Sequence, residues 1–241
     1  MPSKKKDPTM TDQMHFCNYC AITRDEKPLF QCGRCKAHMY CSRECQKADW
    51  QKHKFICETN TAFFNHIEEQ SNSLAGLMHR RTLVDGISLS EYNERIRKWV
   101  RFHNTTIMAV TTYALRLPED ETRARRYVLY IKLGPRPQAE HQGAAGKYFR
   151  VVDAEVLTCT EAAKRPSPWP ESLEQLKIVQ DAEEREGKGT VAVAMVECPP
   201  LAIQIVPFGQ IKDMEGGKVY EGWKSFLMKW VEQGKKLRIP L

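Results

Sequence analysis

The stretch "CNYCAITRDEKPLFQCGRCKAHMYCSRECQKADWQKHKFIC", residues 17–57, decides the fold of the N-terminal part of this chain. It holds seven of the chain's nine cysteines, and these cysteines together with His53 form four pairs whose members are separated by two or three residues. Such pairs favour metal binding over a secreted disulfide scaffold, and the first residues lack the apolar run of a secretory signal. We therefore expect an intracellular protein, nuclear or cytoplasmic, whose thiolates hold zinc.

The spacing of the four pairs matches tetrahedral zinc coordination. A Cys-x2-Cys turn lets both sulfurs reach one metal at about 2.3 Å, and residues four apart share one face of a helix. Catalytic zinc keeps an open coordination position, whereas eight ligands for two ions leave none. We expect two structural Zn²⁺ ions and no enzyme activity. The ligand pairs are Cys17 and Cys20, Cys32 and Cys35, Cys41 and Cys45, and His53 and Cys57.

Helix geometry limits which of these pairs can share one ion. The segment from Cys45 to His53 contains good helix formers and neither glycine nor proline. In a helix, its ends lie about 12 Å apart along the axis, whereas two ligands of one zinc lie roughly 4 Å apart. The third and fourth pairs should therefore serve different ions. Spacing alone leaves both an interleaved and a nested arrangement open.

The complete ligand string from Cys17 to Cys57 resembles a MYND-type zinc finger, because all eight ligand positions are filled at the spacing of that family. The resemblance implies that the arrangement is interleaved. It assigns Cys17, Cys20, Cys41 and Cys45 to one zinc, and Cys32, Cys35, His53 and Cys57 to the other. His15 and His38 fall outside this spacing and are expected at the surface.

The resemblance also implies a surface that recruits another protein, often through a short proline-containing peptide. Gln46 and Trp50 correspond to positions associated with the peptide groove, and they lie four residues apart on one helical face. Trp50 offers a flat apolar wall for a proline ring, and Gln46 offers a donor and an acceptor to an extended backbone. Gly33 stands where peptide-binding members can have a serine donor.

The rest of the chain predicts an α+β organisation. We expect a disordered basic lead at residues 1–13, the finger at residues 14–58, and a separate domain at residues 60–241. A long amphipathic helix is expected after Ser90 as N-cap, ending at Pro118. Strands joined by short links and interrupted by helices indicate a mostly antiparallel sheet. The strand-like runs are residues 127–133, 148–157, 190–197 and 201–206, and further helices are expected at residues 170–186 and 221–233.

Nucleic-acid binding is an alternative that the charge pattern raises and then disfavours. The formal net charge is +7, and the stretch at residues 95–103 mixes basic and aromatic side chains. However, Trp99 fits the apolar stripe of the predicted helix, so we expect it in the core rather than on a stacking surface. The chain also lacks an uninterrupted apolar run of 18 residues, so no membrane association is expected.

An enzyme of the SET–MYND lysine methyltransferase class is a further alternative. In that class the finger is inserted within the catalytic domain, whereas only 16 residues precede Cys17 in this sequence. The sequence after the finger shows no counterpart of the Asn-His-Ser-Cys segment of that class. It also lacks the His-x-Asp iron motif of dioxygenases that carry such a finger. We therefore expect an adaptor rather than a catalyst.

Overall fold

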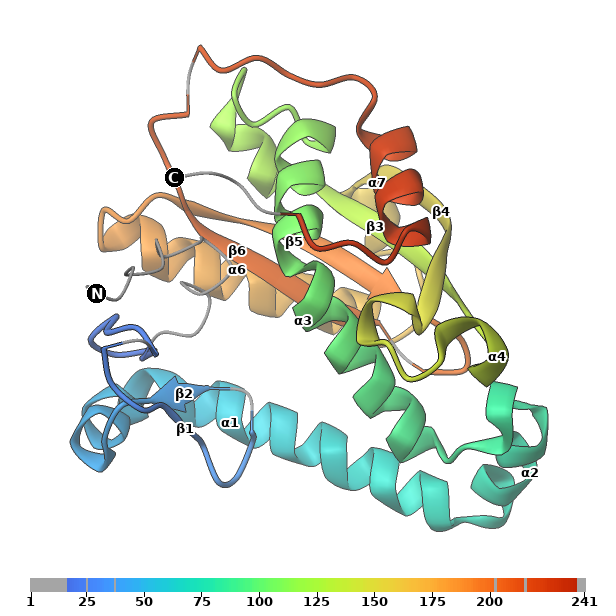
Figure 1. Cartoon of the computed structure of the whole chain (residues 1–241). Coiled ribbons are helices and arrows are strands. Elements are labelled where there is room, and N and C mark those ends of the chain that lie inside the picture. Colours follow the sequence, from blue (N-terminus) through green and yellow to red (C-terminus); the bar gives the residue numbers. More distant parts are fainter. Residues whose placement is uncertain (1–16, 25, 37, 202, 215, 238–241) are drawn as a thin grey trace, which may run out of the picture. The chain divides into compact units, whose positions relative to one another are not determined.

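The computed structural model describes residues 17–237, apart from residues 25, 37, 202 and 215 (Figure 1). The predicted lead at residues 1–13 and His15 lie outside the described residues. The chain divides between Ser90 and Glu91 into two compact units, which we call the N-terminal and the C-terminal unit. The expected boundary near residue 59 lies inside a continuous helix, so the N-terminal unit extends beyond the finger.

The N-terminal unit consists of a small hairpin followed by helices. Strand β1 (Phe30–Gln31) pairs antiparallel with β2 (Met39–Tyr40). Helix α1 (Arg43–Asn72) begins at Ser42, whose hydroxyl accepts a hydrogen bond from the Cys45 backbone N–H. Because no glycine or proline interrupts it, α1 continues 15 residues beyond the last cysteine of the finger. It is followed by α2 (Leu74–Thr82) and η1 (Val84–Gly86).

The C-terminal unit is built on a four-stranded sheet in the order β4-β3-β5-β6. β3–β4 and β5–β6 are antiparallel pairs, and β3–β5 is parallel, so the prediction of an α+β fold with a mostly antiparallel sheet is confirmed. The last strand begins three residues later than expected, after the Pro199–Pro200 turn. The strands are β3 (Tyr127–Pro135), β4 (Phe149–Thr158), β5 (Thr190–Glu197) and β6 (Gln204–Ile211).

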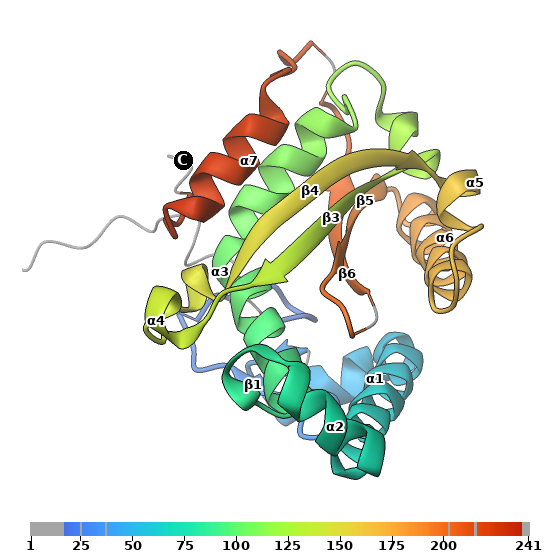
Figure 2. The ribbon, with the colours of Figure 1, turned by 90° about the vertical axis from the view of Figure 1, so that its right-hand side faces the viewer.

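Helices cover both faces of this sheet. Figures 1 and 2 show α3 and α7 side by side on one face and α6 on the other. Helix α3 begins at Leu89, so Ser90 lies in its first turn and is not its N-cap, and it ends before Pro118 as expected. The helical elements are α3 (Leu89–Ala114), η2 (Glu121–Arg125), α4 (Gln138–His141), η3 (Ala145–Lys147), α5 (Cys159–Ala162), α6 (Trp169–Arg185) and α7 (Trp223–Glu232).

The core of the C-terminal unit contains the apolar stripe of α3. Trp99 is fully buried, and its indole N–H donates to the Phe149 carbonyl at 3.2 Å. His103, one turn further, is also fully buried and makes a hydrogen bond to the Gly146 carbonyl at 2.9 Å. Burial, together with the positive charge of Arg136, lowers the pKa of His103 to about 4. Trp99 is therefore a core residue, as the helical pattern predicted.

Candidate metal centre

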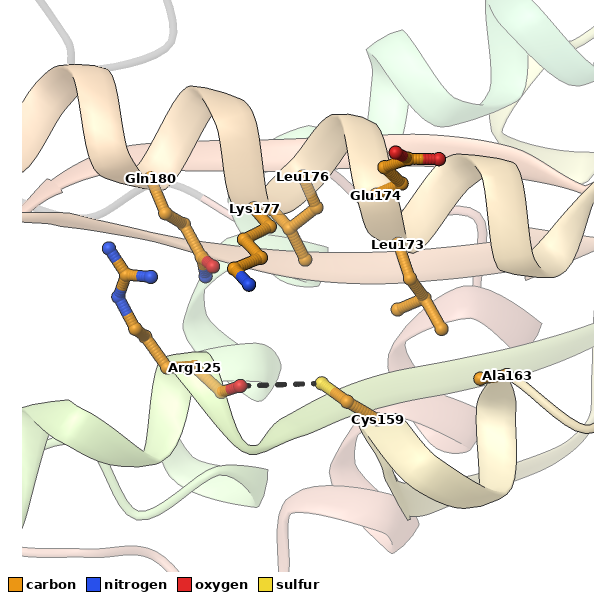
Figure 3. Close-up of a pocket in the computed structure, with 8 residues that line it drawn as sticks. All are labelled: Arg125, Cys159, Ala163, Leu173, Glu174, Leu176, Lys177 and Gln180. Atoms are coloured by element: carbon orange, nitrogen blue, oxygen red, sulfur yellow. Dashed lines mark hydrogen bonds between the residues drawn. The ribbon is translucent and has the colours of Figure 1, made fainter.

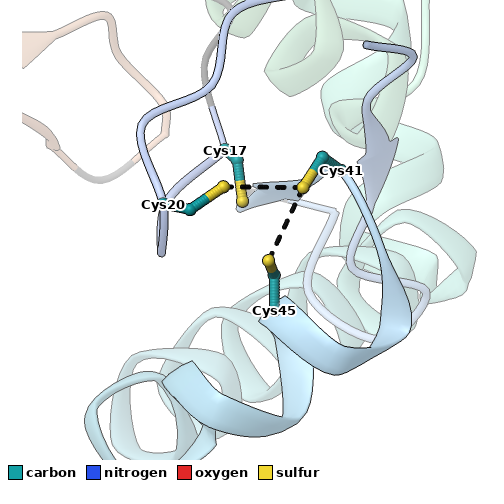
Figure 4. A group of neighbouring side chains, drawn as sticks. All are labelled: Cys17, Cys20, Cys41 and Cys45. Atoms are coloured by element: carbon teal, nitrogen blue, oxygen red, sulfur yellow. Dashed lines mark hydrogen bonds between the residues drawn. The ribbon is translucent and has the colours of Figure 1, made fainter.

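The first cluster consists of four cysteines from three segments of the finger (Figure 4). Cys17 and Cys20 lie on the loop before β1, Cys41 follows β2, and Cys45 is in the first turn of α1. The Cys41 Sγ lies 3.5 Å from the Sγ atoms of both Cys20 and Cys45. Zn–S bonds of about 2.3 Å in a tetrahedron place sulfurs about 3.8 Å apart. The spacing of these four sulfurs therefore suits one zinc ion.

The second cluster contains three cysteines and His53. The Cys32 and Cys57 Sγ atoms lie 3.8 Å apart, and the Cys35 Sγ lies 3.5 Å from the His53 Nε2. All four side chains are at most 2% exposed. His53 and Cys57 reach this cluster from consecutive turns of α1, because residues four apart share one helical face. The cluster is a closed and buried site with four ligands.

The grouping of the ligands is interleaved. Cys45 and His53 lie on the same helix but in different clusters, as the helix geometry predicted. The first and third pairs form one cluster, and the second and fourth pairs form the other. The structure thereby decides between the interleaved and the nested arrangement, which spacing alone had left open.

The electrostatics of both clusters call for a cation. Burial opposes ionisation of Cys17 and Cys32, but hydrogen bonds, chiefly from backbone N–H groups, outweigh it and lower both pKa values to about 6. Burial and contacts with neighbouring thiols raise the pKa of Cys41 to about 12 and that of Cys57 to about 11. Each cluster thus combines a thiol that ionises readily with one that its neighbours keep protonated. A divalent metal resolves this conflict, since it binds all the sulfurs as thiolates. The finger has two structural zinc sites.

His38 does not lie at the surface as expected. It is half-buried, and its ring centroid lies 4.1 Å from that of the zinc ligand His53. Asp49 is buried nearby on α1, and it accepts a hydrogen bond from the Tyr40 hydroxyl at 2.6 Å. Sequence reasoning did not predict that His38, Tyr40 and Asp49 would lie close to His53. The spacing of four residues between Asp49 and His53, which places both on one helical face, is the signal that could have indicated Asp49.

Gln46 and Trp50, the predicted peptide contacts, lie on α1 beside the second cluster. The Gln46 side-chain amide donates to the Cys32 Sγ at 3.5 Å. The Trp50 ring packs edge-on against His53, at 6.1 Å between ring centroids, and 37% of the residue stays exposed. Gly33 faces open space, because a Cβ atom added there would meet no heavy atom within 4 Å. Their role in peptide binding stays a prediction.

Comparison with known proteins identifies the finger. The family model described as the MYND finger matches residues 17–57, the segment that carries both clusters. This segment is a MYND finger. MYND fingers are zinc-binding modules that mediate protein–protein interaction, so this part of the chain is a protein-interaction module. The resemblance seen in the ligand spacing is thereby confirmed.

Proteins similar to this chain match it in the region of the finger. N-lysine methyltransferase SMYD2 from Homo sapiens is 46% identical over 55 residues, which are 23% of this chain and 12% of SMYD2. Egl nine homolog 1 from Mus musculus is 41% identical over 44 residues, 18% of this chain and 11% of that protein. Tudor domain-containing protein 1 from Oryzias latipes is 40% identical over 45 residues, 19% of this chain and 4% of that protein. The chain spans about an eighth or less of these relatives, and no solved structure matches it.

The C-terminal unit has a groove of about 440 Å³ between α5 and α6 (Figure 3). Burial raises the pKa of the Cys159 thiol in this groove, so the thiol stays protonated and is a poor nucleophile. The Arg125 guanidinium is bound by Glu184 and Asp181 at 2.6–2.8 Å. The groove lining contains no histidine that could activate the thiol. It consists of Arg125, Cys159, Ala163, Leu173, Glu174, Leu176, Lys177 and Gln180.

None of the described helices combines the length and the apolarity needed to cross a membrane.

Proposed function

We propose that this protein is a non-catalytic adaptor whose MYND finger recruits another protein through a short proline-containing segment. The observation that carries the proposal is the partly exposed ring of Trp50 beside the second zinc site. An aromatic ring held by its neighbours provides a flat wall for a proline ring without a large loss of side-chain entropy. The contact with His53 restrains Trp50 in this way while 37% of the residue remains accessible.

The surroundings of Trp50 suit an extended peptide. Gln46 lies one turn earlier on α1, and one of its two amide N–H groups donates to the Cys32 sulfur. This contact orients the amide, whose carbonyl oxygen can accept a hydrogen bond from a peptide N–H. Cys32 directly follows β1, a short strand whose residues Phe30 and Gln31 are both exposed. An exposed strand can pair with an extended backbone, so it can contribute to the same groove.

Support for a role without catalysis comes from the saturated zinc sites and from the small share of the relatives that is matched. Eight ligands for two ions leave no coordination position for substrate. The match to SMYD2, which is named as a lysine methyltransferase, covers 12% of that protein. The groove between α5 and α6 holds a protonated thiol instead of an activated nucleophile. Calorimetry with S-adenosylmethionine should therefore show no binding, and a measured affinity would favour the methyltransferase alternative.

A nucleic-acid partner receives little support from α3. Trp99 is buried, and the neighbouring Arg95 and Arg97 form ion pairs at 3.4 Å with Glu91 and Glu94. These cations are therefore already paired within the helix, and we propose a protein partner instead. Since zinc thiolates require a reducing compartment, we further propose that the protein works inside the cell, in the nucleus or the cytoplasm.

The test is capture of a partner by the full chain and by Trp50→Ala. We expect capture of a proline-containing peptide pool to fall at least tenfold, because truncating a central aromatic anchor typically costs about 2 kcal/mol or more. Zinc content should stay at two per chain. The matched control is Tyr220→Ala, which removes a 52% exposed aromatic residue from the C-terminal unit. Equal capture by Trp50→Ala and the unaltered chain would remove the groove from consideration.

A further inference from the structure

A second set of polar side chains lies against the zinc site of His53. His38, Asp49 and His53 each offer a nitrogen or oxygen atom, and these atoms lie within 4.8 Å of one another. Asp49 is 8% exposed and His53 is 1% exposed. The Nδ1 atoms of His53 and His38 are both buried, and neither has a hydrogen-bond partner among the residues that the structure describes. Since buried polar groups are normally satisfied, these two atoms require an explanation.

The Asp49 carboxylate is held in place beside the imidazole of His53. It lies one turn before His53 on α1. Tyr40, the last residue of β2, donates a hydrogen bond to the Asp49 Oδ2 atom at 2.6 Å. The tyrosine hydroxyl engages one of the two carboxylate oxygens and leaves the other available. No lysine or arginine in the described ranges forms an ion pair with Asp49. A buried carboxylate with one donor is costly unless a further donor satisfies it.

We infer that Asp49 is the outer-sphere partner of the second zinc site, accepting the Nδ1 proton of His53 and thereby orienting the imidazole. The Nε2 atom of His53 faces Cys35 within the ligand cluster, so Nδ1 is the nitrogen that carries the proton. Metal-ligating histidines almost always give this second N–H to a carboxylate, a carbonyl or water. Asp49 and His53 have ligand atoms within 4.8 Å of each other, Tyr40 positions the carboxylate, and His38 packs against the ring.

The inference concerns how firmly the zinc is held, and it does not depend on peptide capture. A carboxylate that accepts from Nδ1 raises the basicity of the ligating nitrogen and limits rotation of the ring, so zinc should leave more slowly. The competing explanation is that His38, Asp49 and His53 bind a third cation directly. That arrangement would require the His53 imidazole to bridge two metal ions.

Zinc release from the full, zinc-loaded chain tests the inference. A chromogenic chelator in excess should remove the ion of the second site, and the other ion should follow, because the two sites are interleaved. We expect Asp49→Asn to accelerate this release of zinc 10–100-fold, because outer-shell substitutions typically weaken metal binding by this factor. Tyr40→Phe should accelerate the release less. Glu58→Gln removes an exposed carboxylate next to the ligand Cys57 and should not change the release rate.

A double-mutant cycle separates orientation of His53 from a general structural role. In a His53→Cys background the fourth ligand is a sulfur without an N–H, so Asp49→Asn should no longer change the release rate. An undiminished effect in that background would overturn the inference, as would an unchanged release rate in Asp49→Asn. Metal analysis distinguishes the inference from the competing explanation. Three ions per chain that fall to two in Asp49→Asn would show that Asp49 coordinates a third cation directly.

Discussion

Removing one ligand of the first cluster should release both zinc ions, because the two sites are interleaved. In Cys41→Ala the first site loses a sulfur that lies 3.5 Å from two of its neighbours. A structural zinc contributes on the order of 10–16 kcal/mol of apparent binding free energy in a small finger. Among the described residues of the finger, the apolar cluster around the cysteines contains Tyr40 and the partly buried Ile22 and Leu29. At about 1.5–3 kcal/mol each, these side chains together contribute no more than about 9 kcal/mol.

The remaining core is therefore too small to hold the finger after the loss of one ion. Each ion joins a pair from the first half of the finger to a pair from the second half, so losing one also frees the segments that position the ligands of the other. We expect the zinc content of Cys41→Ala to fall from two per chain to well below one, as measured by plasma mass spectrometry. Cys159→Ala removes a cysteine outside both clusters and should keep two ions.

The C-terminal unit provides an internal reference for this experiment. It contains the buried Trp99 and Trp169, whose near-ultraviolet circular dichroism should persist in Cys41→Ala. Chelation of the unaltered chain should have the same outcome, with loss of the finger and retention of this signal. Retention of one tightly bound zinc in a folded finger would refute the reasoning from interleaving. Joint loss of both units would refute their independent folding, which stays a prediction.

Three further outcomes follow from particular residues. Gly33→Ser adds a hydroxyl at a position where a Cβ meets no heavy atom within 4 Å. The binding free energy of the peptide, measured by fluorescence anisotropy, should become more favourable by about 0.5–1.5 kcal/mol. An unchanged affinity would exclude a donor role at this position. Trp99→Ala should lower the unfolding free energy of the C-terminal unit by about 3–5 kcal/mol in urea titrations with zinc content unchanged, since it empties a fully buried position. The C-terminal unit should also lose about 3 kcal/mol of stability between pH 6.5 and pH 4, because the unfolded chain protonates His103 at its ordinary pKa while burial lowers the folded-state pKa to about 4. His103→Gln should flatten this dependence, and an unaltered slope would assign it to other groups.

The sequence by itself determined the ligands of the finger and the helix that carries half of the second site. These features are local, since a metal constrains residues two or four apart and a helix fixes their relative direction. The helical stripe of α3 likewise placed Trp99 in the core, because the period of 3.6 residues is contained in the segment itself. The mostly antiparallel sheet could also be predicted, from short links between strand-like runs.

Residue spacing left open which pairs share an ion, and the tertiary structure confirmed the interleaved grouping that the family resemblance implied. Only the tertiary structure decided how far α1 continues and where the two units divide. Which distant ligands meet depends on how the loop before β1 and the turn after β2 are placed relative to each other in the folded finger. Both the interleaved and the nested placement are compatible with the same residue spacing. The roles of His38, Tyr40 and Asp49 were equally out of reach, because His38 and Tyr40 approach His53 from the hairpin and not from its own helix. Contacts between segments depend on the folded path of the whole chain, and this is the physical reason that residue spacing could not predict them.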